Sequence, residues 1–474
     1  MASSSSNLPL YVDLDGTLIK SDLTLESILL LLKKNLFFVF AIAFWLLQGR
    51  PYLKSQLAKR VQIPIEQVPV NTEFHEFLLQ EKQRGRKLVL ISASNQNAVE
   101  QVNSHFNLFS ESIGSDETIN LKSANKLAKI QEMSGGESFS YAGNSSADLP
   151  IWKEAAEILL VNCRDSIAEK FDTSNSKRFD NPPSQIAKLW QAIRPHQWLK
   201  NLLVFVPLVL SHQLNQPDLI ILAIIAYISF CLCASSVYLL NDMLDLKSDR
   251  RHRSKSRRAF AAGELPLAIG FIAGPFLFLA GVLIALSLPQ SFLFVLLIYW
   301  LLTSLYSFFL KRLFLVDVFT LAVLYTLRII AGAAAISVQT TIWLLAFSFF
   351  LFLGLALVKR VTELLNVIAE GKQKVDGRAY EDKHLTLLSR IGTVSSAAAI
   401  AVFILYITAP ETTQLYSTPL VLWLICPLLM FLLFRIWQFA HTQKLEEDPV
   451  LFALTDRIGQ IIAVACGLLV WIAA

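Results

Sequence analysis

Long apolar tracts without Lys or Arg occupy most of the second half of the chain. They run over residues 202–240, 264–310, 313–327, 329–358, 391–434 and 458–474. Short breaks rich in Ser, Pro, Gln and Thr divide them into pieces of roughly 20 residues, the length that a helix needs to cross a bilayer. The pattern predicts an all-α polytopic membrane bundle of about nine transmembrane helices.

The basic residues indicate how this bundle lies in its membrane. Apart from Arg328, the Lys and Arg residues among the tracts fall in alternate connections, at 247–258, 311–312, 359–390 and 435–457. By the positive-inside rule these connections are cytoplasmic, which places the N-terminus inside and the C-terminus outside. The first 190 residues show no signal-peptide pattern, so we expect a cytoplasmic N-terminal domain. A cytoplasmic active face suits a bacterial inner membrane.

Composition agrees with a membrane protein. Of 474 residues, 54% are apolar and only 17% are charged, against about a quarter charged in soluble proteins, which excludes a wholly soluble, disordered or fibrous chain. A formal charge of +5 is weak evidence for nucleic acid, and we expect no such partner. The five cysteines lack partners at metal-ligand or disulfide-framework spacing, so we interpret them as small hydrophobes.

Three short apolar runs near the N-terminus predict buried strands, each followed by polar residues. Leu8–Val12 precedes Asp13-Leu-Asp15-Gly16-Thr17, Lys87–Ile91 precedes Ser92, and a third run leads into Gly143-Asn144-Ser-Ser-Ala-Asp148. Two carboxylates two positions apart just past a strand point the same way, and a glycine after them allows a tight turn. With Lys126, these residue types suit phosphoryl chemistry: a carboxylate nucleophile, a second carboxyl as acid and base, phosphate binders and Mg²⁺ ligands.

These four ordered motifs resemble the haloacid dehalogenase (HAD) phosphatase superfamily over about Leu8 to Val161. The resemblance implies an α/β Rossmannoid fold with a helical cap. It also implies that Asp13 is the nucleophile and Asp15 the general acid/base, that Ser92 and Lys126 bind phosphate, and that Asp13, Asp15, Asn144 and Asp148 form a Mg²⁺ site. The family usually has Asp where Asn144 stands, so a silenced module that binds a phosphorylated ligand is an alternative. Alone, Asp13–Thr17 would equally fit an Asx turn.

Residues 28–47 fall where this family often inserts a cap. The apolar run after Lys34 is too short to span a bilayer and too apolar for a solvated surface. We expect it to lie on the membrane or on the second domain, with a buried cap core as the alternative. The expected domains are residues 1–165, with the cap at about 20–75, a polar linker over 166–190, and a membrane domain over 191–474.

The most informative pattern of the chain is acidic and lies at the end of the second expected span. Asn241, Asp242, Asp245 and Asp249 share one face at about 100° per residue. Carboxylates at a helix C-terminus interact unfavourably with the helix dipole and repel one another. They therefore destabilise the helix unless a cation binds among them. Mg²⁺ bridging to a pyrophosphate is the expected occupant, because Mg²⁺ commonly takes one or two carboxylates plus phosphate oxygens.

This acidic motif resembles that of the UbiA superfamily of intramembrane prenyltransferases, whose nine-helix bundle matches the expected spans. The resemblance covers about Ile193 to Ala474 and is closest to the branch that contains decaprenyl-phosphate phosphoribosyltransferase. Its further residues are Arg194, Trp198, Lys200, Asn201, His252, Lys255, Arg258, Gly263, Tyr306, Lys311, Asp317, Arg328, Gly332, Lys359, Arg360, Glu363, Gly377, Arg378 and Tyr380. Arg253 and Ala259 stand where Pro is expected, and a second aspartate motif is not clear.

Two further features have more than one interpretation. Arg328 lies inside an apolar tract and needs a buried partner, either a substrate phosphate, the acidic motif or Asp317. Lys359 and Glu363 are spaced i,i+4, so they could form a plain helix pair or contact substrate.

The sequence therefore favours a Mg²⁺-dependent transferase that moves a phosphoribosyl group from phosphoribosyl diphosphate to a polyprenyl phosphate. Asp242 and Asp245 would be catalytic, and Asn241, Asp242, Asp245 and Asp249 would hold the metal. Substrate would be bound by Lys200, Asn201, Lys255, Arg258, Arg328, Arg378 and Tyr380. The HAD domain would then dephosphorylate the product. A prenyltransferase that uses a prenyl diphosphate is one alternative; a transporter is another, although its key polar groups should lie near mid-membrane in paired broken helices.

Overall fold

The computed structural model describes residues 8–171, 175–179, 183–375, 378–443, 445 and 448–474. The chain divides into two units. The N-terminal unit comprises Met1–Ala192 and Leu239–Ile272, and the membrane unit comprises Ile193–Tyr238 and Ala273–Ala474. Two helices, α11 (Pro217–Leu244) and α13 (Leu267–Ala285), contribute residues to both.

A six-stranded parallel sheet forms the centre of the N-terminal unit, with strand order β3-β2-β1-β4-β5-β6. The strands are β1 (Leu10–Val12), β2 (Leu88–Asn95), β3 (Glu111–Ser115), β4 (Ser140–Gly143), β5 (Glu157–Val161) and β6 (Ser176–Phe179). All three residues of β1 are buried, as expected for a strand covered on both faces. The predicted α/β fold of this region is confirmed.

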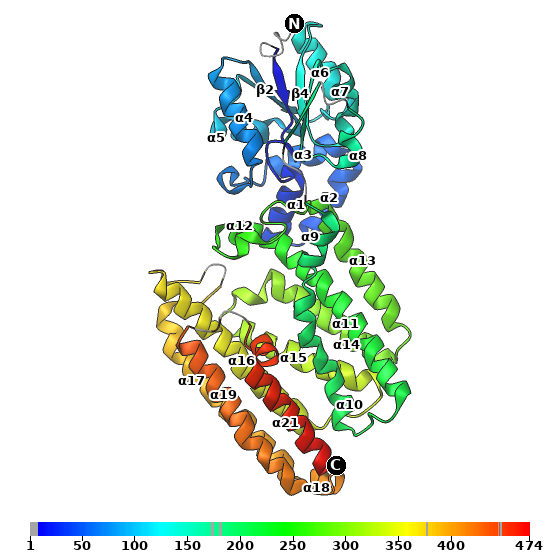
Figure 1. The fold of residues 1–474 in the computed structure, drawn as a ribbon, viewed down its shortest axis with the longest axis vertical. Coiled ribbons are helices and arrows are strands. Elements are labelled where there is room, and N and C mark those ends of the chain that lie inside the picture. The colour runs from blue at the N-terminus through cyan, green and yellow to red at the C-terminus, as the bar shows by residue number, and fades with distance from the viewer. Residues whose placement is uncertain (1–7, 172–174, 180–182, 376–377, 444, 446–447) are drawn as a thin grey trace. The chain divides into compact units, whose positions relative to one another are not determined.

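Helices cover both faces of this sheet (Figure 1). Leu10 and Val12 pack with α4 (Thr72–Gln83) and α5 (Gln96–Phe106) on one face. Tyr11, one position away, packs with α6 (Ala124–Ser134) and α7 (Leu149–Glu154) on the other. Because the chain winds outward in both directions from β1, the carboxyl ends of β1 and β4 border the crevice where such sheets bind ligands.

Three helices follow β1 before the chain returns to the sheet: α1 (Leu23–Lys34), α2 (Phe38–Leu47) and α3 (Arg50–Ala58). The Asp22 carboxylate caps α1 by accepting a 3.0 Å hydrogen bond from the Leu25 amide. Leu31, Trp45, Leu53 and Leu57 form a small core among the three helices. Most other side chains of α2 are exposed, so the alternative that the apolar run after Lys34 forms a buried cap core is wrong.

Part of the stretch expected as a polar linker is ordered structure. Ser176–Phe179 forms β6, and its residue Phe179 is buried against α4, with ring centroids 5.3 Å from Phe74. Two helices, α8 (Asp165–Ala168) and α9 (Gln185–Ala192), flank it. The polar composition misled the prediction because only Phe179 of this edge strand is buried. Residues 172–174 and 180–182 of this stretch lie outside the described part of the chain.

The membrane unit is helical. It contains the larger parts of α11 and α13. Its other helices include η4 (Pro195–Phe205, a 3₁₀ helix), α10 (Val206–Leu210), α14 (Gln290–Phe308), α15 (Val316–Ala335), α16 (Ile342–Ala369), α17 (Leu385–Thr408), α18 (Pro410–Leu415), α19 (Ile425–His441), α20 (Pro449–Thr455) and α21 (Arg457–Ala473). Within the described residues, seven helices are long and apolar enough to cross a membrane, or up to eight if α20 and α21, bent by 78°, count as one span. The expectation of nine spans is not confirmed.

The difference in span number arises at the start of the unit. Instead of a first full span, residues 195–210 form η4 and the short α10, both with Pro in the first turn. The backbone of η4 packs closely against α15 at Gly332, where a Cβ would collide with the Val204 carbonyl. Gly332 therefore permits an irregular segment to be buried against a long helix.

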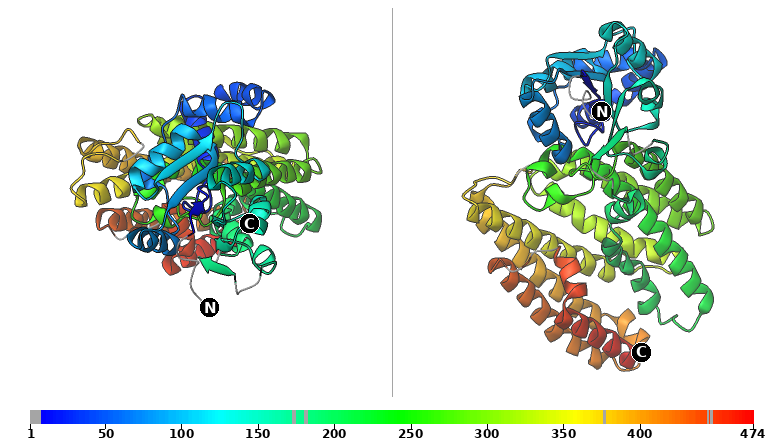
Figure 2. Two further views of the ribbon diagram at one scale, coloured as in Figure 1. Left: turned by 90° about the horizontal axis from the view of Figure 1, so that it is seen from above. Right: turned by 45° about the horizontal axis from the view of Figure 1, so that its top comes forward.

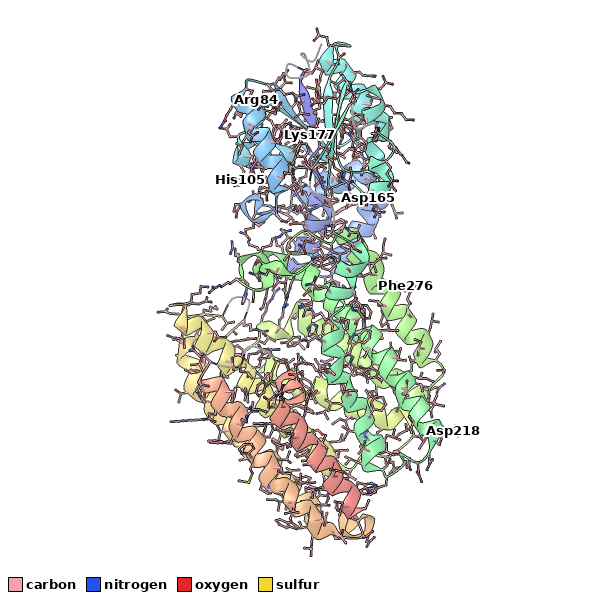
Figure 3. The ribbon with its side chains drawn as sticks, viewed as in Figure 1. Arg84, His105, Asp165, Lys177, Asp218 and Phe276 are labelled. Atoms are coloured by element: carbon pink, nitrogen blue, oxygen red, sulfur yellow. The ribbon has the colours of Figure 1, made fainter. Side chains whose placement is uncertain are left out.

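Consecutive long helices pack side by side, with α16 between α15 and α17, and α19 against α16 and α17 (Figures 1 and 2). Large apolar side chains point away from this bundle. Phe276 on α13 is 68% exposed and projects outward (Figure 3). An apolar outer surface of this kind is expected of helices that face lipid.

Candidate functional site

The carboxylate of Asp13 lies at the carboxyl end of β1 and contacts Lys126. The Asp13 amide donates to the Ala142 carbonyl (3.0 Å), which ties the residue to β4. Lys126, on α6, donates 2.7 Å to Asp13 Oδ1 and 3.0 Å to the Tyr141 hydroxyl. Lys126 is buried, not a surface residue of its helix. Burial raises the pKa of Asp13, and the ammonium of Lys126 opposes this rise.

Asp15 lies on the other side of the same turn. Its Oδ1 accepts from the Leu23 amide (2.9 Å) and its Oδ2 from the Ser94 hydroxyl (2.5 Å). Burial, with a contribution from the nearby Asp22 carboxylate, raises the pKa of Asp15 to about 7. A carboxyl group that is partly protonated near neutral pH suits the predicted role of acid and base.

The hydroxyl that contacts Asp15 belongs to Ser94 and not to Ser92, which the sequence singled out. Ser92 is fully buried, and its hydroxyl accepts from the Ser94 amide (3.0 Å). The two residues are two positions apart on β2, so they share one face of the strand. Sequence spacing alone could have suggested Ser94 as a second candidate.

Asp148 holds the loop that presents Asn144. One Asp148 oxygen accepts from the Tyr141 hydroxyl (2.7 Å), and the other accepts from the amides of Asn144 (3.2 Å) and Ser145 (3.0 Å). The Asn144 side chain lies directly over Gly16, where a Cβ would collide with its amide. Gly16 has a φ of +79°, so glycine is favoured there both by its backbone conformation and by this approach.

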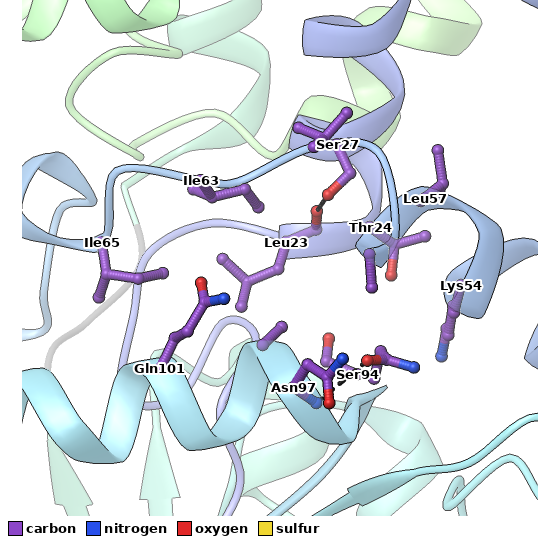
Figure 4. A pocket seen from close by; sticks show the side chains of 14 residues that line it. Leu23, Thr24, Ser27, Lys54, Leu57, Ile63, Ile65, Ser94, Asn97 and Gln101 are labelled. Carbon is purple, nitrogen blue, oxygen red and sulfur yellow. Dashed lines mark hydrogen bonds between the residues drawn. The ribbon is translucent and has the colours of Figure 1, made fainter.

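A pocket opens between helices α1, α3 and α5 and the end of β2 (Figure 4). Ser94 lines it from β2, and Lys54 reaches it from α3. The Lys54 ammonium donates to the Ala93 carbonyl and to Asn120 Oδ1 (3.0 Å for the latter), and burial lowers its pKa. Leucine, isoleucine and valine residues form much of the remaining wall.

Two carboxylates of the acidic motif converge on one cation within the N-terminal unit. Helix α11 ends at Leu244, and α12 (Leu246–Arg251) begins after a break at Asp245. Arg258 Nη1 lies 3.1 Å from Asp242 and 2.7 Å from Asp249, and both carboxylates are buried. Burial raises the pKa of Asp249, and Arg258 opposes the rise. The two carboxylates therefore face the same point.

The remaining acid of the motif contacts helix α1. Lys33 donates to Asp245 Oδ1 (3.1 Å) and to the Leu244 carbonyl (2.8 Å). One helical turn further, Arg250 makes a two-pronged ion pair with Glu26 of α1, at 3.0 and 2.6 Å. These contacts join helix α1 to the acidic motif.

The donor atoms of the motif fit Mg²⁺ in part. Among the described residues, no group of three or more His, Cys, Asp or Glu side chains could hold a metal ion by itself. However, Mg²⁺ is commonly bound by one or two protein carboxylates, and substrate phosphate oxygens complete its coordination shell. The position between Asp242 and Asp249 already attracts a positive group, the Arg258 guanidinium. Asn241 lies in the last turn of α11, and Lys255 begins the short 3₁₀ helix η5 (Lys255–Arg257).

In the membrane unit, Arg328 of α15 is buried among neutral groups. It donates to Asn201 Oδ1 (2.9 Å), the Tyr299 hydroxyl (2.9 Å) and the Leu324 carbonyl (2.7 Å). The rings of Tyr299 and Tyr325 lie 4.9 and 5.0 Å from its guanidinium carbon. No described carboxylate forms an ion pair with Arg328, so the alternative that it pairs with Asp317 is wrong.

Two lysines meet at Asp448, a residue that the sequence did not reveal. Lys200 on η4 and Lys359 on α16 lie 3.0 and 2.7 Å from Asp448 Oδ2, and Tyr325 donates to Oδ1 (3.2 Å). Lys359 thus pairs with Asp448 rather than with Glu363 in its own helix. Asp448 stands just before α20, 89 positions from Lys359, and no local pattern connects them.

A second polar cluster surrounds Asp317 at the start of α15. Arg360 donates to Asp317 (2.6 Å) and contacts Glu363 (2.5 Å) and the Tyr306 hydroxyl (3.1 Å). The Tyr380 hydroxyl also donates to Asp317. Arg378 completes the cluster, 3.6 Å from Asp317, 3.3 Å from Glu363 and 3.3 Å from the Tyr306 hydroxyl. Gly377 of the same motif lies outside the described residues.

The chain is similar to several known proteins. Residues 202–457 match the model of the UbiA prenyltransferase family. An uncharacterized protein, y4nM, of Sinorhizobium fredii is 36% identical over 97% of this chain and 90% of its own length. Nodulation protein NoeC of Azorhizobium caulinodans is 31% identical over 59% of this chain and 91% of its length. Decaprenyl-phosphate phosphoribosyltransferase of Mycobacterium tuberculosis is 28% identical over 62% of this chain and 94% of its length.

Solved structures are similar to separate parts of the chain. A UbiA homologue from Archaeoglobus fulgidus, bound to DMAPP and Mg²⁺, aligns with 60% of this chain and 98% of its own, at a TM-score of 0.45 and 15% identity. A substrate-bound phosphoserine phosphatase aligns with 40% of this chain and 99% of its own, at a TM-score of 0.28 and 14% identity.

Proposed function

Because this chain belongs to the UbiA prenyltransferase family, we propose that it is a membrane transferase that moves a 5-phosphoribosyl group from phosphoribosyl diphosphate to a polyprenyl phosphate. Relatives named decaprenyl-phosphate phosphoribosyltransferase support this donor and acceptor. The weak match to a second aspartate motif counts against a prenyl diphosphate donor. In the proposed reaction an acceptor phosphate oxygen bonds to the anomeric carbon of the ribose as the bond to pyrophosphate breaks.

The acidic motif would bind the leaving pyrophosphate. Asp242 and Asp249 would hold Mg²⁺, which would supply charge neutralisation for the departing diphosphate. Arg258 already contacts both carboxylates, so it would have to turn toward the diphosphate when the metal binds. Its guanidinium is planar and carries several donors, which suits a phosphate ligand.

The observation that carries the proposal is the buried Arg328 with its neutral partners. A cation in an apolar bundle is costly unless it has a counter-charge. Asn201, Tyr299 and Leu324 orient the guanidinium. The carboxylate that acts on it electrostatically, Asp448, is already paired with two lysines, so positive charge exceeds negative charge here. An anionic substrate group, such as the acceptor phosphate, would compensate that charge.

We propose that the N-terminal unit removes the 5-phosphate from the product. The Asp13 carboxylate would attack phosphorus and form an aspartyl phosphate, while Asp15 gives its proton to the departing ribose oxygen. Water, deprotonated by Asp15, would then release inorganic phosphate and restore Asp13. Lys126 would offset the negative charge beside Asp13. The covalent link between the two units would raise the effective concentration of the transferase product at the phosphatase site.

One experiment separates these steps. The purified chain in nanodiscs is incubated with Mg²⁺, phosphoribosyl diphosphate and polyprenyl phosphate, and pyrophosphate, inorganic phosphate and lipid-linked sugar are followed. We expect Asp13→Asn to release pyrophosphate but no inorganic phosphate, and Asp242→Asn to release neither.

Two results would contradict the proposal. Turnover only with a prenyl diphosphate and an aromatic acceptor would overturn the phosphoribosyl donor. Equal inorganic phosphate from the unmodified chain and from Asp13→Asn would overturn the phosphatase step.

A further inference from the structure

Helix α2 has no polar face. All ten of its residues, Phe38–Leu47, are apolar, and the residue before it is Phe37. Phe37, Phe40 and Leu47 are 76%, 73% and 87% exposed. Large apolar side chains exposed side by side over a whole helix are unusual for a surface in water, and they mark an interaction site.

One side of α2 is already used. Trp45 is buried against Leu31, Leu53 and Leu57 of the neighbouring helices. The Arg60 guanidinium stacks on the Trp45 ring, 4.7 Å from its centroid. This packing fixes the orientation of α2, so Phe40, Phe44 and Leu47 are held outward by the fold and do not need a partner to keep the helix in place.

The contacts of α1 show that α2 begins near the end of helix α11. Lys33 donates 2.8 Å to the carbonyl of Leu244, the last residue of the membrane-spanning helix α11. Helix α2 begins at Phe38, five residues after Lys33. Five residues reach at most about 18 Å. The start of α2 therefore lies within about 18 Å of the Lys33 backbone, and the side chain of Lys33 contacts the end of a transmembrane helix.

The charges beside α2 are positive. Lys34 ends α1, and Arg50 begins α3 after two connecting residues, whereas the neighbouring Lys33 is paired with Asp245. An apolar helix flanked by Lys and Arg fits the boundary of a bilayer, where the side chains enter the acyl region and the cations remain among anionic headgroups.

We propose that α2 is a lipid anchor of the N-terminal unit, lying in the surface of the bilayer that α11 crosses. Its ten residues extend about 15 Å, half of what a span needs, so the helix enters one leaflet and does not cross. Lipid fits better than a protein partner because the apolar residues continue around the helix wherever Trp45 does not pack. The proposal holds for any substrate of the enzyme.

The test uses the full chain in nanodiscs of phosphatidylcholine and phosphatidylglycerol. Cys466, the one cysteine that is not fully buried, is replaced by Ser, and a single Cys with an environment-sensitive NBD probe is placed at Phe40 or Leu47. The matched control is Ile119→Cys, an exposed apolar position of the same unit. Doxyl-labelled lipid and aqueous iodide serve as the two quenchers.

We expect the probes at positions 40 and 47 to lose fluorescence with doxyl lipid and to be protected from iodide, and the probe at 119 to behave in the opposite way. Quenching by iodide at all three positions would overturn the proposal. So would protection from iodide without quenching by doxyl lipid, because a second copy or another protein would then cover α2. Circular dichroism and gel filtration verify that each labelled chain remains folded.

Discussion

The ion pair between Glu26 and Arg250 gives the sharpest stability prediction. The side chains are 4% and 6% exposed, and the two contacts are 3.0 and 2.6 Å long. Ser21 donates a further hydrogen bond to Glu26, and Arg250 Nε donates to the Ala261 carbonyl (3.3 Å). The substitution Glu26→Gln keeps the shape of the side chain and removes its charge, which leaves the Arg250 guanidinium buried without a counter-charge.

The expected cost is large because the pair is desolvated. Removing one partner of a buried ion pair destabilises a protein by about 3–5 kcal/mol, against about 0–1 kcal/mol for an exposed pair. In a unit of 150–250 residues, each kcal/mol lowers the melting temperature by about 2–4 °C. Glu26→Gln should therefore lower the melting temperature of the N-terminal unit by roughly 6–20 °C.

Cys163 reports on this unfolding selectively. It is fully buried and is the one cysteine of the N-terminal unit. Alkylation of Cys163 during a temperature ramp, followed by peptide mass spectrometry, gives a melting curve for this unit within the full chain. The exposed Lys59–Glu117 pair provides the control, since Lys59→Met should leave the curve unchanged.

A double variant tests the cause. Glu26→Leu combined with Arg250→Met removes both charges, and it should recover most of the stability that Glu26→Gln loses. Two results would contradict this reasoning: a melting temperature of Glu26→Gln equal to that of the unmodified chain, or a double variant that is less stable than Glu26→Gln. Either result would mean that the buried ion pair does not stabilise the contact between α1 and the acidic motif.

Four further predictions concern the sites. Ser94→Ala should lower the phosphatase kcat about tenfold by removing a hydrogen bond to Asp15, whereas a loss confined to KM would contradict that role. Arg258→Gln should enlarge the rise in melting temperature that Mg²⁺ produces, because Asp242 and Asp249 lose their competing cation; an unchanged Mg²⁺ effect would refute this. Arg328→Met should lower kcat/KM for the lipid phosphate by about 10- to 150-fold, and Arg328→Lys by less, as checked by initial rates. Asp448→Asn should destabilise the membrane unit by about 3–5 kcal/mol, because Lys200 and Lys359 lose their shared carboxylate; unchanged resistance to unfolding in detergent would argue otherwise.

Local sequence patterns predicted the broad organisation of the chain. The buried strands followed from short apolar runs that end in polar residues, and the membrane character followed from uninterrupted apolar tracts. Both patterns depend on neighbouring residues, because strand and helix periodicity are local properties. The number of spans did not follow, because η4 and α10 replace a full span where the backbone packs on Gly332.

The partners of the charged residues depended on tertiary structure. The acidic motif was evident from its spacing, but that Arg258 joins Asp242 to Asp249 while Lys33 takes Asp245 is decided by the loop and by helix α1. Asp448 is an ordinary acid in the sequence, and only folding brings it between Lys200 and Lys359. In the same way, only folding brings the Ser94 hydroxyl to the Asp15 carboxylate.

The sequence by itself determined where the chain is buried in lipid, where a sheet forms, and which residue types stand beside each other along the chain. These properties result from hydrophobic burial and backbone periodicity, which act over a few residues. Only the tertiary structure decided which carboxylate neutralises which cation, and that Arg328 has none among the described residues. A charge buried in an apolar medium is stabilised by whatever group the fold brings within a few ångströms, however far away that group lies in the chain.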